Sequence, residues 1–331
     1  MQPPTPATDE SPDRRTGRLV DYSLILAVLI GTLARSCGRW HWMLELTTHF
    51  TVQAAVLSLI AGIILLLRRR RWWGGLCLGL AFYNADAWIL SWVPESFGTS
   101  AAVNNESLRV VSANVYSQNR NAKGLREWLD SIEPDVIFVS EVDPWWAMQI
   151  EGWKADWPHQ IVRARGDHFG LALLSRYPIR DSEVRILERD IPAVQARIAG
   201  PTGDITVVGL HTLPPVGALR SAIRNRQLVE SATWISELPK PRIVVGDLNC
   251  APASPYFGDF LKATGLRDSR RGWGWQASWH ATRPLIRIPI DHCLVEPGMR
   301  VMNREVGPDV GSDHFPIWAQ IGKWHQPDVT H

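Results

Sequence analysis

The first part of the chain carries three long apolar segments, over residues 24–34, 50–67 and 72–93. A bilayer takes about 20 apolar residues, so the first segment needs its flanking residues to span, while the other two are close to sufficient alone. Tryptophans gather near the segment ends, as in the aromatic belt of membrane proteins. The pattern predicts a membrane anchor with about three transmembrane helices over residues 19–93. The alternatives are three buried core helices of a soluble protein or, for the first segment only, a signal peptide.

Beyond the anchor the apolar runs become short and alternate with helical segments. Runs typical of buried strands cover residues 108–113, 136–140, 170–175, 205–210, 243–246, 288–295 and 317–321. Two segments with apolar positions at helical spacing, residues 124–132 and 218–238, lie between them. This alternation predicts a soluble α/β domain over residues 108–322. Composition assigns the remaining segments as a disordered cytoplasmic tail, a linker and a second tail, over residues 1–18, 94–107 and 323–331.

Polar residues that can carry chemistry follow these short runs. Asp247 and Asn249 come directly after one run, and residues two apart in a strand point to the same side. Others follow or interrupt a run in the same way, namely Asn114, Glu141, His211, Asp291, Asp313 and His314. A carboxylate can take a proton or hold a cation, and amide and imidazole groups can donate to a phosphate. Each alone has a structural alternative, such as an Asx turn at Asp247 or a solvated loop carboxylate at Glu141.

Taken together, these residue types suit metal-assisted hydrolysis of a phosphate ester. The oxygen-rich set favours a hard divalent cation over zinc, whose Cys and His spacing motifs the sequence lacks. The G-x-S-x-G motif of serine hydrolases is also missing from the sequence. Residues 1–98 hold nine Lys and Arg and seven Asp and Glu, so the totals of 35 and 33 leave 26 of each sign for the rest. This formal neutrality weighs against a dedicated nucleic-acid binder.

Arginines set the expected orientation in the membrane. They precede the first apolar segment, and residues 68–71 are four consecutive arginines between the second and third segments. The positive-inside rule places both groups in the cytoplasm, so three spans put residues 94–331 outside. Arg35 and Arg39, in the opposite loop, are a smaller contrary signal.

Six short motifs resemble those of the endonuclease/exonuclease/phosphatase superfamily, which includes pancreatic deoxyribonuclease, exonuclease III, sphingomyelinases and inositol-phosphate phosphatases. In the family's order they are Ser112-Ala113-Asn114, Val139-Ser140-Glu141, Gly209-Leu210-His211, Gly246-Asp247-Leu248-Asn249, Ile290-Asp291-His292 and Ser312-Asp313-His314-Phe315-Pro316. The resemblance covers residues 108–321 and leaves out the membrane segments, although some bacterial members are similar in carrying them.

The resemblance implies a four-layer α/β sandwich of two packed β-sheets flanked by helices, with a Mg²⁺ or Mn²⁺ site. It implies Glu141 as the principal metal ligand, with Asn114 and Asp313 beside it. Asp247 would orient or deprotonate the attacking water, and Asn249 would hold the phosphate.

The resemblance also implies roles for the histidines. His314, oriented by Asp291, would stabilise the phosphorane or serve as acid or base, and His211 would contact the phosphate or the leaving group. Some nucleases of the family carry an acidic metal ligand two residues after the first Asn. Here that position is Tyr116, which puts a second ligand at that strand in doubt.

Two further pairs of residues lie near these motifs. Asp167 and His168 are candidates for lining the site, although the motifs do not align them. Cys250 and Cys293 are neighbours of the proposed site residues. An extracytoplasmic domain would allow them to form a disulfide, and two buried free thiols are the preferred expectation.

The expected activity is that of a phosphodiesterase or phosphatase, nuclease-like or phospholipase-like, at a bacterial cell membrane. Its substrate would be a phospholipid head group, an inositol phosphate or a nucleic acid. The main alternative is a catalytically inactive, membrane-anchored binding module of the same fold, and a transporter-like protein with a soluble sensor domain is a third reading. The presence of Glu141, Asp247 and His314 argues against an inactive module.

Overall fold

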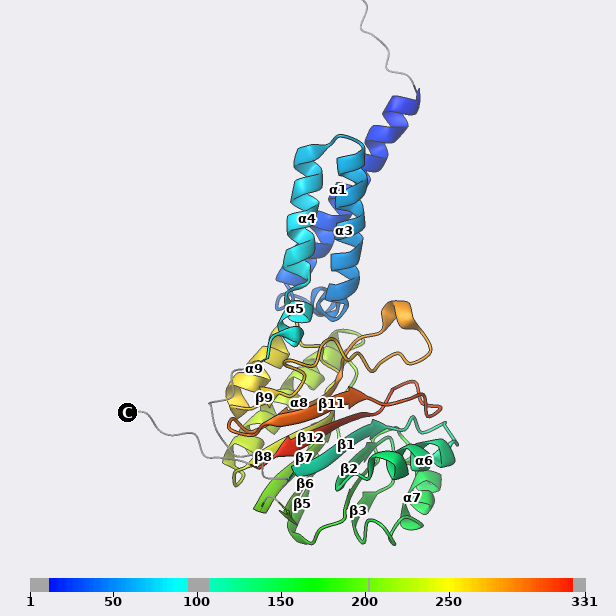
Figure 1. Ribbon diagram of the computed structural model, residues 1–331, viewed down its shortest axis with the longest axis vertical. Helices are drawn as coiled ribbons and strands as arrows, with labels where there is room; N and C mark the ends of the chain where they lie inside the picture. The colour runs from blue at the N-terminus through cyan, green and yellow to red at the C-terminus, as the bar shows by residue number, and fades with distance from the viewer. Residues whose placement is uncertain (1–11, 95–106, 202, 324–331) are drawn as a thin grey trace, which may run out of the picture.

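The computed structural model describes residues 12–94, 107–201 and 203–323, and in it two six-stranded mixed β-sheets pack face to face (Figure 1). The first sheet has the order β11-β12-β1-β2-β4-β3, and the second has the order β5-β6-β7-β8-β10-β9. The strands are β1 (Ser107–Asn114), β2 (Val136–Ser140), β3 (His159–Arg163), β4 (Leu171–Ser175), β5 (Ile179–Leu187), β6 (Ile191–Gly200), β7 (Gly203–His211), β8 (Arg242–Asp247), β9 (Arg267–Asp268), β10 (Asp291–Val295), β11 (Val301–Val306) and β12 (Ile317–Gly322).

Helices cover the outer face of each sheet and complete four layers. They are α6 (Ala122–Ile132) and α7 (Pro144–Glu151) on the first sheet, and α8 (Ala218–Glu237) and α9 (Pro255–Thr264) on the second. A continuous cluster of buried apolar side chains fills the space between the sheets. Strands such as β2 and β4 are buried on both faces, which explains their unbroken apolar sequences. The predicted four-layer α/β sandwich is therefore confirmed.

Local sequence signals explain where these helices lie. Asn121 caps α6 by accepting a hydrogen bond from the Gly124 amide (3.0 Å), and Leu125 and Leu129, four residues apart, are fully buried against the first sheet. Pro255 occupies the first turn of α9, and Gly265 ends that helix in the left-handed conformation.

Two glycines allow the backbones to approach closely beside the expected site. A Cβ atom on Gly209 of β7 would lie 2.2 Å from the ring of Phe138 in β2, on the opposite sheet. A Cβ on Gly246 of β8 would lie 1.8 Å from the carbonyl oxygen of Leu210, and Gly246 has a φ of 137°. A larger residue at either position would push the sheets or strands apart next to the site.

Parallel pairing brings the carboxyl ends of four strands to one edge of the sandwich. In the first sheet β1 runs parallel to β2, with Asn114 opposite Ser140. In the second sheet β7 runs parallel to β8, with His211 opposite Asp247, and Asp247 also faces Asp291 of antiparallel β10. The polar residues that follow the apolar runs in sequence thus collect at one edge.

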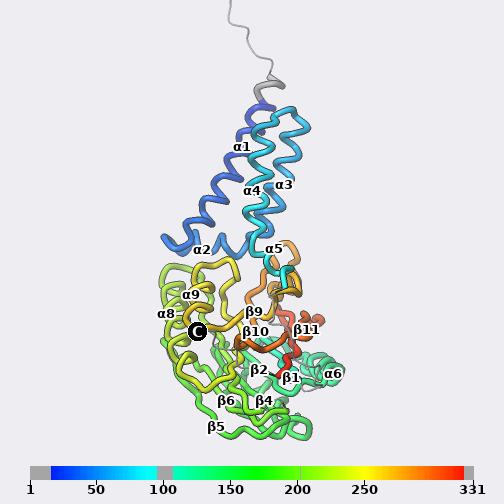
Figure 2. Tube along the Cα trace, turned by 60° about the vertical axis from the view of Figure 1, so that its left-hand side comes forward, coloured from blue at the N-terminus to red at the C-terminus, as the bar shows by residue number. Residues whose placement is uncertain are grey.

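The N-terminal part forms a helical stalk above the sandwich (Figures 1 and 2). It consists of α1 (Pro12–Ser36), α2 (Trp42–Thr47), the short 3-10 helix η1 (Thr48–Phe50), α3 (Thr51–Leu67), α4 (Arg71–Asn84) and α5 (Asp86–Trp92). Among the described residues, two helical stretches are long and apolar enough to cross a membrane, Thr16–Ser36 and Trp42–Leu67. The third apolar segment is divided at Ala85 into α4 and α5, so neither piece reaches that length alone.

One boundary of the stalk differs from the sequence prediction. Residues 1–18 were expected to be disordered, but α1 already begins at Pro12, where proline is favoured in the first turn of a helix. Residues 1–11, 95–106 and 324–331 lie outside the described part, and with them most of the predicted tails and linker.

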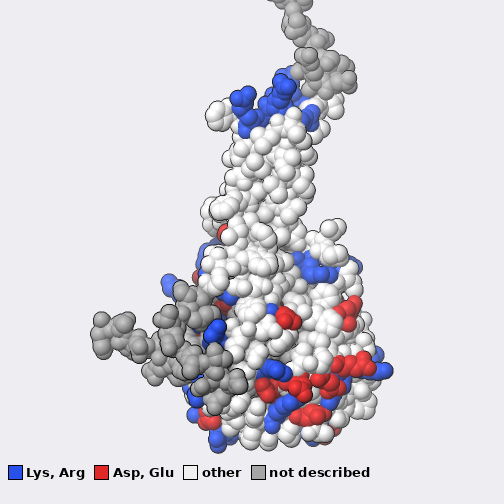
Figure 3. Space-filling view, in the orientation of Figure 1, with Lys and Arg blue, Asp and Glu red and all other residues white. Residues whose placement is uncertain are grey.

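Small residues and apolar surface characterise the stalk. Gly62 of α3 and Gly74 of α4 face each other so closely that a Cβ on Gly74 would lie 3.0 Å from the Gly62 carbonyl oxygen. Such contacts between small residues are typical of packed membrane helices. Leu26, Leu57 and many other large apolar side chains point outward, and Figure 3 shows Lys and Arg only at the far end of the stalk on this face. Exposed apolar surface of this extent favours a lipid environment.

A buried ion pair joins the stalk to the sandwich. Glu45 of α2 accepts hydrogen bonds from Arg224 of α8 (Nη2 to Oε2, 2.7 Å) and from the Ser254 hydroxyl (2.7 Å). The side chains of Glu45 and Arg224 are 1% and 0% exposed. A second pair, Arg39 with Asp259, also bridges the two parts, but these side chains are 55% and 53% exposed.

The two ion pairs lead to the first testable expectation. Replacing Glu45→Ala leaves the Arg224 guanidinium buried without its carboxylate, which typically costs about 3–5 kcal/mol of unfolding free energy. The matched variant Asp259→Ala removes an exposed pair and should cost less than about 1 kcal/mol. Denaturant unfolding of the full chain in detergent measures both. Equal losses in the two variants would contradict a structural role for the buried pair.

Candidate active site

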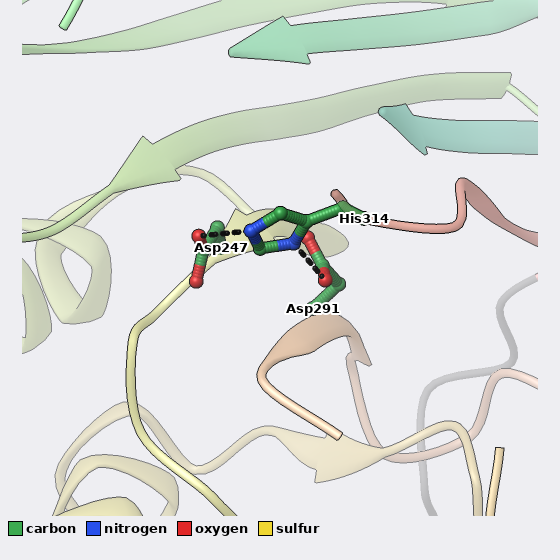
Figure 4. Close-up of side chains that lie close together, drawn as sticks. All are labelled: Asp247, Asp291 and His314. Atoms are coloured by element: carbon green, nitrogen blue, oxygen red, sulfur yellow. Dashed lines mark hydrogen bonds and ion pairs between the residues drawn. The ribbon is translucent and has the colours of Figure 1, made fainter. Parts of the chain in front are cut away.

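His314 lies between two carboxylates at the edge where the strands end (Figure 4). Its Nδ1 is 2.8 Å from Asp291 Oδ2, and its Nε2 is 3.6 Å from Asp247 Oδ2. The Ser278 hydroxyl donates a second hydrogen bond to Asp291 Oδ2 (2.5 Å). The side chains of Asp247, Asp291 and His314 are close enough to one another to hold an ion. Because the ring nitrogen and the Asp291 oxygen already share a hydrogen bond, the geometry is that of a histidine oriented by a carboxylate.

Asn114 connects this histidine to Glu141. The amide nitrogen of Asn114 lies 3.1 Å from Glu141 Oε1, 3.3 Å from Asp247 Oδ2 and 3.4 Å from His314 Nε2. Glu141 follows β2 directly and has a φ of 64°, a left-handed conformation that is uncommon for such a residue. Its other oxygen accepts a hydrogen bond from the backbone amide of Ser117 (3.2 Å). Glu141 is therefore aimed into the site by its backbone and held there from the β1 side.

His211 and Asn249 complete the cluster on the second sheet. His211 Nε2 is 3.7 Å from Asp247 Oδ2, and its ring packs against Phe169 with 5.2 Å between ring centroids. Asn249 donates from its backbone amide to Asp247 Oδ1 (2.8 Å) and from its side chain to the Thr212 carbonyl oxygen (2.9 Å). The turn at Asp247 is thus an Asx-type turn, and the same turn aligns a site residue.

Asp313 is a candidate cation ligand because one of its buried carboxylate oxygens lacks a hydrogen-bond partner among the described residues. Its Oδ2 accepts a hydrogen bond from Trp279 Nε1 (3.1 Å), while its Oδ1 is buried and has no hydrogen-bond partner within the described part of the chain. A buried carboxylate oxygen without a partner is costly unless a cation or water satisfies it. Glu141 and Asp313 offer carboxylate oxygens, as Mg²⁺ and Mn²⁺ prefer, whereas Asn114 turns its amide nitrogen toward Glu141 while its oxygen accepts from the Tyr116 amide.

Burial and neighbouring charges shift the pKa values of this cluster. Burial raises the pKa of Asp247 to about 8, and the Asp291 carboxylate adds to this rise while His314 opposes it. For His314, burial alone would lower the pKa, but Asp291 and Asp247 outweigh it and raise the pKa to about 10. Burial lowers the pKa of His211 to about 4. At neutral pH His314 is consequently a cation and His211 a neutral donor and acceptor.

Asp167 and His168 were predicted as candidates for lining the site without a motif that aligns them. His168, a candidate without a motif, does reach the site, since its Nδ1 is 3.2 Å from Glu141 Oε2. Asp167 instead forms an ion pair with Arg165 at the surface. Tyr116 donates from its backbone amide to Asn114 Oδ1 (3.0 Å) and so supports the site through its main chain.

Several supporting residues had no sequence signal. Ser278 and Trp279 contact Asp291 and Asp313 from a loop without regular structure, so neither periodicity nor a motif could have identified them. The two cysteines beside the site, Cys250 and Cys293, are buried free thiols in the structure.

Comparison with known families agrees with this geometry. The model of the Endonuclease/Exonuclease/phosphatase family matches residues 111–314, which is more than half of the chain. The chain therefore belongs to this family, as its six motifs suggested. The family's members are phosphoester hydrolases, and its fold is the one observed.

Particular relatives are more distant. The Escherichia coli (strain K12) and Shigella flexneri proteins named "Uncharacterized protein YbhP" are each 38% identical over 88 residues, which is 25% of this chain and only 34% of the relative's length. Zebrafish TDP2 complexed with a single-strand DNA product has a TM-score of 0.55 at 17% identity, covering 66% of this chain and 99% of that chain. A mutant of beta toxin from Staphylococcus aureus with bound magnesium ions has a TM-score of 0.54 at 18% identity, covering 64% and 99%. At these identities the structures support the fold alone.

The electrostatics of His314 give the second testable expectation. The variant Asp291→Asn removes the charge that raises the histidine pKa, so that pKa should fall by at least about one unit from its value of about 10. Titration of ¹³C-labelled histidine rings by NMR measures it, with His314→Asn used to assign the signal. Asp181→Asn, an exposed carboxylate on β5, is the control and should leave the titration unchanged. An unchanged pKa in Asp291→Asn would show that Asp291 does not control this imidazole.

Proposed function

We propose that this protein is a membrane-anchored, divalent-cation-dependent hydrolase of phosphate esters. The observation that carries the proposal is the buried His314 between Asp291 and Asp247, with Glu141 and Asn114 beside them. A protonated imidazole, a carboxylate of high pKa and a nearby carboxylate that can hold a cation are the groups that phosphoester hydrolysis requires.

The cation would be held by Glu141, Asn114 and Asp313. When bound, Mg²⁺ or Mn²⁺ supplies positive charge that offsets the negative charge of the phosphate and of its transition state. The family's members are typically dependent on divalent cations, and the magnesium ions of the similar beta toxin structure support this choice.

The protein's own side chains would then carry the proton transfers. Asp247 in its ionised form takes a proton from the attacking water as its oxygen bonds to phosphorus, and its raised pKa makes this carboxylate a stronger base. The bond from phosphorus to the leaving oxygen breaks, and that oxygen takes the proton of His314. His211 and Asn249 donate hydrogen bonds to the phosphate oxygens. The products are an alcohol and a phosphate with one ester bond fewer, so atoms and charges balance.

The same chemistry applies to several substrates. A phospholipid head group, an inositol phosphate and a nucleic acid all present a phosphate ester, and the DNA product in the TDP2 structure shows only what that protein binds. An inactive binding module of the same fold remains the alternative. The paired Asp291 and His314 favour the enzyme, because a module that only binds has no use for a buried histidine oriented by a carboxylate.

The third testable expectation is the activity itself. The purified full chain should hydrolyse bis-p-nitrophenyl phosphate or p-nitrophenyl phosphate with Mg²⁺ or Mn²⁺ and lose activity in EDTA. Asp247→Asn should lower kcat by about 10²–10⁴-fold, the usual contribution of a general base. Asp181→Asn is the matched control and should keep the wild-type rate. Wild-type protein inactive with both cations and on both esters would favour the binding module.

A separate variant tests the cation ligand. Glu141→Gln keeps the shape of the side chain but removes its charge, so it should raise the Mg²⁺ concentration that gives half-maximal rate. Circular dichroism confirms the fold of each variant. A wild-type Mg²⁺ requirement in Glu141→Gln would assign the cation to other residues.

We further propose that the stalk crosses the bacterial cell membrane three times, with the sandwich on the extracytoplasmic side. Asp21 of α1 pairs with Arg68 at the far end of the stalk (3.0 Å). At the near end, Gln53 of α3 donates to the Leu285 carbonyl oxygen and Ser91 of α5 accepts from the Gly272 amide. The hairpin of α3 and α4 therefore returns to the domain from which it starts, so α4 has to cross wherever α3 does. The arginines at the far end favour the cytoplasm.

This orientation is the fourth testable expectation. Alkaline phosphatase fused after His331 should be active, and green fluorescent protein fused there should stay dark, since the first needs export and the second fails after export by the general secretory route. A fusion after Arg69, in the loop at the far end, is the control and should give the opposite result. Fluorescence after His331 together with a silent phosphatase would place the sandwich in the cytoplasm.

A further inference from the structure

A large apolar groove lies where the stalk meets the sandwich. It has a volume of about 730 Å³, within the range of ligand pockets. One wall is the first two turns of α3, with Val52, Val56 and Leu57. The other is the sandwich, including the loop around η2 (Pro284–Ile286) and Phe315. Figure 1 shows this loop beside the lower end of α3.

In the proposed membrane orientation the groove lies at the depth of lipid acyl chains. The 17 residues of α3 span about 25 Å at 1.5 Å per residue, close to the about 30 Å hydrocarbon thickness of a bilayer. With the arginines after Leu67 at one surface, the first turns of α3 fall inside the opposite leaflet. Val56 and Leu57 are 48% and 65% exposed, and Leu285 of the facing loop is 85% exposed. The groove is therefore open sideways to lipid.

The inner wall of the groove is formed by the same chain segments that carry residues of the candidate active site. Phe315 follows His314 in the chain, and its backbone amide donates to the Ser278 carbonyl oxygen (2.9 Å). Ser278, in turn, bonds to Asp291 and follows Ala277, another lining residue. Ala277 and Phe315 of the groove wall are thus the chain neighbours of Ser278 and His314, so a lipid held in the groove lies against the segments that position these two residues.

The positive charge of the Arg287 side chain, which lines the groove, complements a phosphate. Arg287 lines the groove, and its guanidinium lies 4.7 Å from the ring centroid of Phe315. It donates to the carbonyl oxygens of His280 and Ala281. Within the described residues its hydrogen bonds go to carbonyl oxygens and to no carboxylate, so its charge is available to an anionic head group.

We infer that this groove holds an acyl chain of a bilayer phospholipid and that the phosphate of this lipid is the substrate of the site. The inference rests on the proposed hydrolase activity and adds its substrate class. Apolar walls, access from the leaflet and one cation beside the site match a lipid with an anionic head group. The extended, charged backbone of a nucleic acid has no counterpart in an apolar groove.

The test compares a bilayer substrate with a soluble one. The full chain is reconstituted in vesicles of phosphatidylethanolamine and phosphatidylglycerol with Mg²⁺, and phosphate-containing or alcohol products are measured by mass spectrometry. The variant Leu57→Trp fills the groove. It should lower kcat/KM on the vesicle lipids at least about tenfold, which corresponds to about 1.4 kcal/mol, and leave hydrolysis of bis-p-nitrophenyl phosphate unchanged.

Two further variants make the comparison specific. Val56→Trp fills the same groove from the neighbouring position and should reproduce the effect if one variant fails to fold. Ile63→Trp adds the same ring to an exposed position of α3 that does not line the groove, and it should behave as wild type on both substrates. Retained hydrolysis of the soluble ester shows that each variant is folded.

The outcomes separate the inference from the proposed function. Cleavage of bis-p-nitrophenyl phosphate or plasmid DNA without cleavage of vesicle lipids overturns the lipid substrate and leaves the hydrolase intact. Lipid cleavage that neither groove variant changes, or that Ile63→Trp lowers equally, overturns the role of the groove. A wild-type protein that cleaves none of these substrates overturns the hydrolase and the lipid substrate together.

Discussion

The close contact between Gly209 and Phe138 sets the distance between the two sheets beside the site. Stacked sheets usually lie about 10 Å apart, and here a glycine lets an aromatic ring of the other sheet approach its backbone directly. The site depends on this spacing because neither sheet carries it alone. The first sheet supplies Asn114 and Glu141, and the second supplies Asp247. A wider gap would separate the Asn114 amide from Asp247, 3.3 Å away.

Two buried arginines of the sandwich are paired with buried carboxylates. Arg242 pairs with Glu296 and Arg270 with Asp268, each within the interior. At the candidate active site the carboxylates outnumber the cations, since His314 is the charged partner of several acidic groups. Burial raises the pKa of Asp247, the Asp291 carboxylate adds to this rise, and His314 opposes it. A cation bound among these carboxylates would offset their charge.

The strands and the edge at which the site residues gather could be predicted, because both follow from the pattern of apolar and polar residues over short stretches of the sequence. Strands buried on both faces appear as unbroken apolar runs, and in parallel pairs the residues that follow them, such as Glu141, meet at one edge. What could not be predicted depends on distant pairs. Glu45 and Arg224 are 179 positions apart, and nothing in either neighbourhood indicates the other. The break between α4 and α5 at Ala85 was likewise hidden, because a run of apolar residues does not show where a helix stops.

The ion pair between Glu45 and Arg224 also connects the stalk rigidly to the sandwich. Arg224 donates through Nη2 to Glu45 of the stalk and through Nη1 to the carbonyl oxygen of Asn249 (2.6 Å), two residues after the catalytic candidate Asp247. One buried guanidinium thus fixes the stalk and the turn of the site to each other. Because these contacts are buried and charge-assisted, the site keeps a defined height and direction relative to the stalk. An enzyme that only diffused along the membrane on a flexible linker would have no need for such a rigid connection, whereas one that takes its substrate from the bilayer would.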